Sequence, residues 1–338
     1  MIHNFCVLCK WENYFCDASK KMIVTAPQIS WGPYDIMEIM SISNRRRLAC
    51  GFALAAASVT GFAATFVFGG ALTREDGVSP EALSFLRFAI AGTAMLVIGG
   101  ATRDGRRRLL APRRRDWLSM LWLAPVGTAF MAWCVFMGCA RVSTANASMA
   151  DALTPLMIFV VDALVRRHVD GRGLVGLFCG LVGALLVIQI IHAGGVALEA
   201  YSLGDVYILL SAAVWGVYTV CGQKLNRRLG SSVFTTWTML IGAAMMGVVC
   251  LVGDFAWPTT ARAWLLTFGL GLVSTLLPFW TWNAAQKFLP ISTLAMTAYF
   301  TPVIAAALGV VFLDEPVTAL QWLGTVFVVG SAVIETRR

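Results

Sequence analysis

Long apolar runs alternate with short polar connections along the chain from residue 49 to residue 335. A helix needs roughly 20 mostly apolar residues to cross the hydrocarbon core of a bilayer. Runs of this length predict ten transmembrane helices, at residues 49–70, 81–101, 117–138, 144–165, 172–192, 204–223, 232–252, 263–286, 291–312 and 317–335. The connections between these runs are too short to hold a soluble catalytic or nucleotide-binding domain.

Two stretches of the sequence repeat each other 147 residues apart: Met149-Ala-Asp-Ala-Leu-Thr-Pro-Leu-Met157 and Met296-Thr-Ala-Tyr-Phe-Thr-Pro-Val-Ile304. Each belongs to a block of five predicted spans, residues 48–193 and residues 201–336. Because five is odd, the second block enters the bilayer in the opposite orientation. The predicted fold class is therefore an all-α polytopic membrane protein whose ten transmembrane helices form two inverted five-helix repeats. Secondary transporters have this architecture, with the site between the halves near the bilayer midplane.

Composition agrees with a membrane protein and excludes several classes of function. Apolar residues make up 58% of the chain and charged residues 13%, and the mean hydropathy is +0.75. The sequence holds no Gly-x-x-x-x-Gly-Lys-[Ser/Thr] phosphate loop, which excludes ATP-driven pumping by this chain. The three histidines lie outside the predicted spans or at their ends, and Asp151 lies about 16 Å along a helix from Asp162. We therefore expect no catalytic residues, no cofactor and no metal site.

The net charge of +8 resides mainly in the connections, so it indicates topology rather than binding to nucleic acid. Basic residues gather in every second connection, at residues 45–47, 103–115, 166–172, 224–228 and 337–338, whereas the intervening connections carry only Arg74, Arg141 and Arg262. Cytoplasmic loops of membrane proteins carry such an excess of Lys and Arg. We expect a multi-pass protein of the bacterial inner membrane with both termini in the cytoplasm.

Residues 1–47 differ from the rest because they show no apolar core and only a weak pattern. Three interpretations of this N-terminal tail are open: a disordered or interfacial segment, a regulatory segment, or sequence upstream of a true start at Met37 or Met40. We favour the over-extended start. No function is assigned to this segment.

Several short motifs occur in an order that resembles a known family. They are Ser79-Pro80 with Arg87 at the start of the second span, Thr-Pro in the fourth and ninth spans, Gln223-Lys224 after the sixth, and Phe312-Leu-Asp-Glu-Pro316 before the last. From about residue 48 to 335 the chain resembles the EamA-type transporters of the drug/metabolite transporter superfamily. The resemblance implies a ten-helix exporter or permease of small metabolites, often amino acids or related solutes. One departure is that Arg166-Arg167-His168 stands where Leu313-Asp314-Glu315 stands in the second copy.

Asp151 is the strongest candidate for contact with a solute. It lies one helical turn before Pro155, near the middle of the fourth predicted span. Proline removes a backbone hydrogen bond and clashes with the carbonyl four residues earlier, here that of Asp151 itself. A carboxylate at this depth suits proton coupling or a substrate amine, although hydrogen bonding to neighbouring helices explains it equally well. Pro155 and its counterpart Pro302 are the candidate hinges.

Arg87 lies about a turn and a half into the second span, where it either contacts the solute or serves packing and snorkelling. The remaining candidates for the cavity are polar or aromatic side chains of the third, eighth and ninth spans: Trp133, Trp280, Asn283, Tyr299 and Thr301. Trp280 and Asn283 share one helical face and Trp282 and Gln286 another, so one pair is expected to line the cavity. Trp215 and Tyr218 are weaker candidates.

These features predict a secondary transporter that exports a small polar or amphipathic metabolite by alternating access. The expected partners are a small-molecule solute and the lipid bilayer, with protons as a candidate coupling ion. A nucleotide-sugar or lipid-linked-sugar carrier and a passive channel are the alternatives. Gly176 and Gly180 suit close helix packing within one chain or between two, so the oligomeric state stays open.

Overall fold

The structure, a computed structural model, describes residues 33–142, 147, 151–167, 171–187, 191–192, 195–196, 203–301, 303–304 and 319–336. These residues are almost entirely helical. In the first half the helical segments are α2 (Pro33–Gly70), η1 (Ala71–Glu75), α3 (Pro80–Gly100), α4 (Arg103–Leu109), α5 (Arg114–Ala124), η2 (Pro125–Phe130), α6 (Met131–Cys139), α8 (Thr154–Arg166) and α9 (Gly171–Val187).

The second half begins with two short strands, β1 (Ile191–His192) and β2 (Gly195–Val196), which pair antiparallel. Its helical segments are α10 (Leu203–Leu229), α11 (Ser231–Val252), α12 (Ala261–Gly271), η3 (Leu272–Leu276), α13 (Leu277–Ala285), α14 (Ile291–Thr297) and α16 (Ala319–Thr336). The segments η1, η2 and η3 are π-helical, and η2 and η3 continue directly from the α-helices on either side. Thus α5–η2–α6 and α12–η3–α13 are each one long helical rod.

Six segments among the described residues are long and apolar enough to cross a membrane: Arg46–Glu75, Pro80–Gly100, Arg114–Cys139, Leu203–Leu229, Ser231–Val252 and Ala261–Ala285. They coincide with the first, second, third, sixth, seventh and eighth predicted spans. Shorter apolar segments lie in α9 and α16, at Leu174–Gly183 and Trp322–Ser331. The chain is therefore a multi-pass membrane protein.

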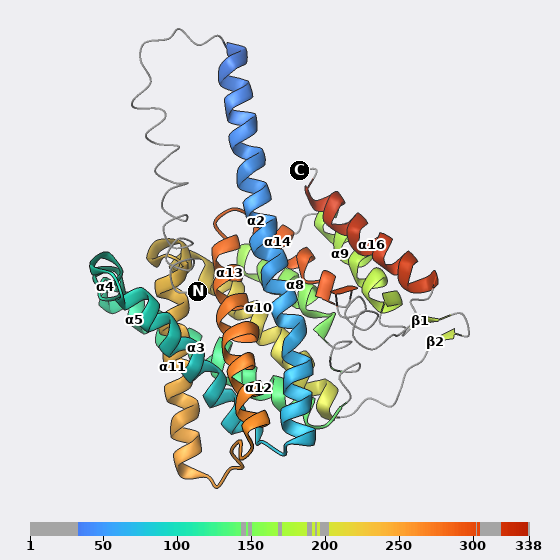
Figure 1. Ribbon diagram of the computed structural model, residues 1–338. Coiled ribbons are helices and arrows are strands. Elements are labelled where there is room, and N and C mark those ends of the chain that lie inside the picture. Colours follow the sequence, from blue (N-terminus) through green and yellow to red (C-terminus); the bar gives the residue numbers. More distant parts are fainter. Residues whose placement is uncertain are drawn as a thin grey trace.

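Helices far apart in sequence pair across the bundle (Figure 1). The long helix α2 packs along α13, α3 packs along α11, and α10 contacts both α6 and α8. The pair formed by α9 and α16 lies to one side of these helices. Every pairing named here joins a helix that precedes residue 193 with one that follows residue 201. The interior of the bundle therefore lies between the two halves of the chain.

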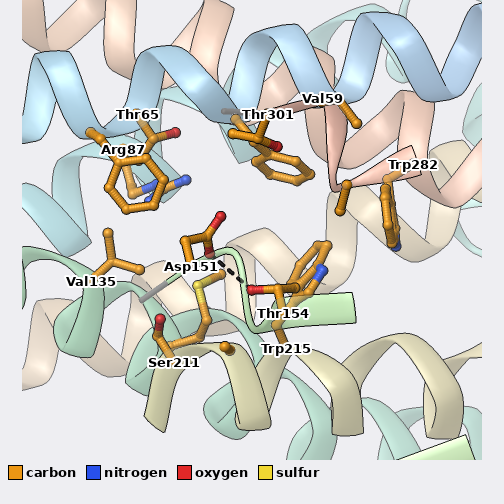
Figure 2. Close-up of a pocket in the computed structure, with 15 residues that line it drawn as sticks. Val59, Thr65, Arg87, Val135, Asp151, Thr154, Ser211, Trp215, Trp282 and Thr301 are labelled. Atoms are coloured by element: carbon orange, nitrogen blue, oxygen red, sulfur yellow. Dashed lines mark hydrogen bonds between the residues drawn. The ribbon is translucent and has the colours of Figure 1, made fainter. Parts of the chain in front are cut away.

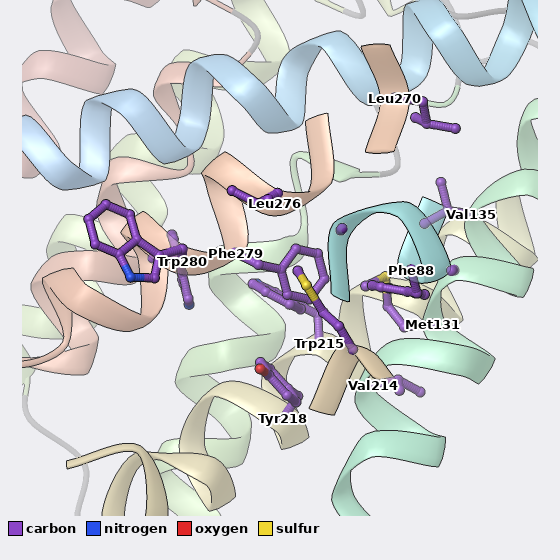
Figure 3. Close-up of a cluster of buried hydrophobic side chains, with 14 of the residues drawn as sticks. Phe88, Met131, Val135, Val214, Trp215, Tyr218, Leu270, Leu276, Phe279 and Trp280 are labelled. Carbon is purple, nitrogen blue, oxygen red and sulfur yellow. The ribbon is translucent and has the colours of Figure 1, made fainter. Parts of the chain in front are cut away.

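Aromatic side chains fill the centre of this bundle (Figure 3). Phe279 is fully buried, and its ring centroid lies 5.0 Å from that of Trp215 and 5.6 Å from those of Phe62 and Phe88. The contacting rings are all T-shaped, which is a favourable arrangement for aromatic pairs. This cluster joins α2, α3, α10 and α13 at one point.

The π-helical segments η2 and η3 begin 147 residues apart, the same separation as the repeated sequence stretches. Each holds a threonine at the matching position, Thr128 and Thr275, and each hydroxyl donates to a backbone carbonyl of the preceding turn. A π-turn inside an α-helix is rare and frequently marks a functional site. The same backbone irregularity thus recurs in both halves.

The repeated Thr-Pro stretch also begins a helix where a continuous kinked helix was predicted. Residues 152–153 form a turn, and α8 starts at Thr154 with Pro155 in its first turn. Proline costs nothing there because that N–H has no intrahelical acceptor in any case. In the second stretch α14 ends at Thr297, and residues 298–299 form the turn. Pro302, the other predicted hinge, lies outside the described residues.

Ion pairs join the two halves at opposite ends of the bundle. Arg228, at the end of α10, pairs with the buried carboxylate of Asp116 in the first turn of α5. At the opposite end of the bundle, just before the start of α3, Glu75 and Asp76 pair with Arg262 at 2.6 Å and 3.4 Å. The first pair involves a buried carboxylate and the second is largely exposed, so the first is the stronger constraint.

Gly183 and Gly330 occupy matching positions of α9 and α16 but have different surroundings. A Cβ on Gly183 would lie 2.7 Å from the carbonyl oxygen of Gly324 and 2.8 Å from Cβ of Phe327, whereas a Cβ on Gly330 would meet nothing within 4 Å. We expect Gly183→Ala to destabilise the protein by about 1–3 kcal/mol through overpacking. Thermal unfolding of the purified protein in detergent measures this. Gly330→Ala is the matched control, and equal melting temperatures of the two variants would contradict the packing of α9 on α16.

Candidate transport site

A cavity of about 70 Å³ lies in the middle of the bundle, between the two halves of the chain (Figure 2). Apolar and aromatic side chains form most of its wall. The polar and aromatic groups on this wall include Arg87, Asp151, Thr154, Trp215, Trp282 and Thr301. Pockets for drug-sized ligands measure about 300–1,000 Å³. In this conformation the cavity therefore admits only a small solute or a few water molecules.

Asp151 lies on the cavity wall just before the first turn of α8, and Figure 2 shows its carboxylate directed into the open space. The hydroxyl of Thr154 donates to its Oδ1 over 2.9 Å. The break at residues 152–153 leaves the amino end of α8 beside this carboxylate. Helix amino termini carry a partial positive charge and favour an anion there. The interruption of the helix thus stabilises a charge that a continuous helix would leave in hydrocarbon.

Arg87 lies on the same cavity, on α3, and its side chain is 1% exposed. Its Nε donates to Oγ1 of Thr275 over 2.9 Å, and its Nη2 donates to the carbonyl oxygen of Ser274 over 3.5 Å. Both acceptors belong to η3. Burial at this depth excludes snorkelling, whereas the bonds to η3 agree with packing against the second half, the other alternative to solute contact that the sequence left open.

Two tryptophans and two phenylalanines form the aromatic wall of the cavity: Trp215, Trp282, Phe62 and Phe66. The ring centroids of Trp215 and Trp282 are 5.8 Å apart, and Phe62 lies 5.3 Å from Trp215. The indole N–H of Trp282 donates to Thr219 over 3.3 Å, so the polar edge of this ring is already occupied by the protein. The wall offers flat apolar surface to the carbon skeleton of a solute.

Thr301 lines the cavity beside Ala298, whereas the neighbouring Tyr299 does not. Tyr299 is fully buried, and its hydroxyl donates to the carbonyl oxygen of Leu177 in α9 over 3.1 Å. Its ring fills the space left by the absent side chain of Gly180. Its contacts hold α9 in place.

Trp280, Asn283 and Trp133 are not among the residues that line the cavity. The indole of Trp280 donates to Ser232 over 3.1 Å, and that of Trp133 donates to Glu81 over 2.8 Å. The amide of Asn283 donates to Thr235 over 2.9 Å and to Tyr218 over 3.2 Å. All three side chains bond to neighbouring helices in this structure, and the expected contact with a solute remains a prediction.

Thr154 and Trp282 are among the cavity residues that were not chosen from the sequence. Thr154 is the counterpart of Thr301 in the repeated Thr-Pro stretch, so the repeat contains the signal that identifies it. Trp282 was assigned to the helical face opposite Trp280. Periodicity separates the two faces of a helix but does not tell which of them points inward.

A helical membrane protein with a partly polar cavity between its two halves has the architecture of a transporter. The model of the EamA-like transporter family matches residues 49–189 and again residues 202–336. The chain belongs to this family, which confirms the resemblance seen in the sequence.

Curated relatives cover most of the chain. An uncharacterized transporter of Archaeoglobus fulgidus is 22% identical over 267 residues, covering 77% of this chain and 89% of that protein. The uncharacterized transporter YdfC of Bacillus subtilis is 26% identical over 258 residues, covering 75% and 81%. The pseudopaline exporter CntI of Pseudomonas aeruginosa is 25% identical over 224 residues, covering 66% and 76%. A solved crystal structure aligns with a TM-score of 0.68 at 23% identity, covering 86% of this chain and 96% of that one, and supports the fold.

Asn283 and Thr301 should respond differently to substitution. Asn283→Ala removes the buried hydrogen bonds that Asn283 makes with Thr235, Tyr218 and Gln286, which costs about 1–3 kcal/mol. From these contacts we expect a lower melting temperature with an unchanged affinity for the transported solute, in contrast to the solute contact expected from the sequence. Thr301→Val, on the cavity wall, should change that affinity with little loss of stability. Thermal unfolding and the concentration dependence of uptake measure both effects. A change of affinity confined to Asn283→Ala would refute this assignment.

Proposed function

We propose that the protein is a secondary transporter that exports small metabolites, such as amino acids or related solutes, by alternating access. The observation that carries this proposal is the small cavity between the two halves, which holds a buried guanidinium and a carboxylate on a mostly apolar wall. Charged groups inside a membrane are costly, and they normally mark substrate or ion pathways. The name of one relative, a pseudopaline exporter, also supports export of a small solute.

The proposed architecture is ten transmembrane helices in two inverted repeats, residues 48–193 and 201–336. The two separate matches to one family model support this division. So does the arrangement of helices: α2 contacts α13 and η3 in the way that α10 contacts α6 and η2. Five spans in each repeat would place the second repeat upside down, and the shared cavity would then lie near the bilayer midplane.

The proposed orientation places both termini in the cytoplasm of the inner membrane. The basic connection between α3 and α5 and the basic end of α10 lie at one end of the bundle, where Arg228 meets Asp116. An excess of Arg and Lys favours the cytoplasmic side. Export would then begin at this end and finish at the end where Arg262 meets Glu75.

Within this function Asp151 is the group that meets either a solute amine or a proton. Its Oδ1 accepts from Thr154, while its side chain is open to the cavity. If this carboxylate changes its partner or its protonation state when the cavity opens to the other side of the membrane, the movement of the proton is coupled to the movement of the solute. The broken helix beside it, with Pro155 in the first turn of α8, is the proposed hinge.

Reconstitution into proteoliposomes tests the function directly. Purified protein is assayed with a panel of amino acids and small metabolites, with and without an imposed pH gradient. Accumulation of a solute against its concentration gradient supports a coupled carrier. Flux that only dissipates gradients would indicate a passive channel.

Asp151→Asn should abolish transport or make it independent of the pH gradient, because the amide carries no charge and binds no proton. Expression and melting temperature should stay near those of the native protein. Asp162→Asn is the matched control, because Asp162 lies in α8, the helix that follows Asp151, and pairs with Arg166 at 2.6 Å near its end. Native transport by the Asp151 variant at every pH would remove this residue from the mechanism.

A further inference from the structure

The guanidinium of Arg87 is a buried charge with an unused donor. Its Nη1 has no hydrogen-bond partner among the residues that the structure describes, and no ion pair joins it to a carboxylate among them. A buried guanidinium that no carboxylate neutralises carries a large desolvation cost. Such a group retained at a cavity indicates that its partner is a molecule the protein binds.

The two bonds that Arg87 makes leave one edge of its guanidinium open. Nε and Nη2 are held by Thr275 and by the carbonyl of Ser274, both in the π-helical segment η3. Each terminal nitrogen carries two protons, so the edge formed by Nη1 and Nη2 still has one donor on each nitrogen. Two parallel N–H groups on one edge match the two oxygens of a carboxylate.

Aromatic rings lie around this guanidinium, whose residue is 1% exposed. Its central carbon lies 5.1 Å from the ring centroid of Phe88, 5.3 Å from that of Phe136 and 5.9 Å from that of Phe279. Contacts with ring faces offset part of the desolvation cost without neutralising the charge. A charge-assisted hydrogen bond formed in such surroundings is stronger than one in water.

We propose that Arg87 is the anion subsite of the cavity and binds the carboxylate of the transported solute end-on through Nη1 and Nη2. This inference rests on the proposed transport function and adds the substrate class, a small solute that carries a carboxylate. Figure 2 shows Arg87 and Asp151 on the same cavity, so a solute whose carboxylate meets Arg87 can present an amine to Asp151. Thr275 acts as a positioning residue that fixes the plane of the guanidinium through Nε.

A bound inorganic anion such as chloride has the same chemistry and must be distinguished from a solute carboxylate. Thermal unfolding of the purified full-length protein in detergent makes this distinction with four probes: L-alanine, L-alaninol, sodium lactate and sodium chloride. Alaninol retains the amine of alanine and lacks its carboxylate. Ionic strength is held constant with a bulky sulfonate that is too large for the cavity.

The proposal predicts that alanine and lactate stabilise the native protein and that alaninol does not. Arg87→Gln should raise the half-saturating concentration of alanine about tenfold or more, as expected for loss of a charge-assisted bidentate contact. Thr275→Val should raise it by a smaller factor, and Arg87→Lys should restore part of the affinity relative to glutamine. Arg262→Gln, an exposed arginine at the end of the bundle, is the control and should bind as the native protein does.

Four results would overturn the proposal: equal stabilisation by alanine and alaninol, no stabilisation by either carboxylate, unchanged alanine binding by Arg87→Gln, or stabilisation by chloride alone. If Arg87→Gln does not fold, Arg87→Lys and Thr275→Val still test it. Uptake into proteoliposomes separates this subsite from the proposed function. Transport of a solute without a carboxylate would support the proposed transport function and contradict the anion subsite. Arg87-dependent binding of a carboxylate without any transport would support the subsite and contradict the transport function.

Discussion

Within the hydrocarbon of a membrane, every backbone N–H and C=O must find its partner inside the protein, and the position of the cavity follows from that constraint. Irregular turns are tolerated only where another part of the chain supplies hydrogen bonds. Around η3 that supply comes from the first half: Ser58 donates to the carbonyl of Pro278 over 2.8 Å, and Thr65 donates to that of Ser274 over 3.2 Å. The π-turn η3 therefore lies where the two halves meet, and it bonds to Arg87, which lines the cavity.

Both halves contain the same π-helical turn, but the side chains that contact it differ. The threonine of η3, in the second half, accepts from Arg87 of the first half, whereas the threonine of η2, in the first half, donates to the carbonyl of Thr238 in α11 over 3.2 Å. Helices approach each other closely at two glycines in this region. The missing side chain of Gly127 makes room for Tyr218, and that of Gly242 makes room for Thr128. The π-turn is thus present in both halves. At η3 it supports a contact with a charged group, and at η2 it supports a neutral, tightly packed contact.

Much of the helical framework could be predicted because it depends on local composition. The predicted span 81–101 is observed as Pro80–Gly100, and 232–252 as Ser231–Val252. Arg87, Asp151 and Thr301, three of the residues proposed from the sequence, lie on one cavity, because charged or hydroxyl groups deep in an apolar run have few alternatives. Trp282 was missed in favour of Trp280 because the inward face of α13 depends on α2, α10 and α11, which are remote in sequence. The π-turn η3 adds a further rotation that an ideal period of 3.6 residues does not include.

Both charged groups on the cavity come from the first half of the chain, and this asymmetry bears on how a solute is carried. Arg87 belongs to α3 and Asp151 precedes α8, while the matching position of Asp151 in the second half is Ala298, on the same cavity. The second half contributes neutral groups, Trp282 and Thr301. If the halves rock against each other, a solute held by both charges stays with the first half while the neutral wall moves past it. The solute then stays bound while the cavity opens to the other side of the membrane, because its contacts with the charged groups do not have to break.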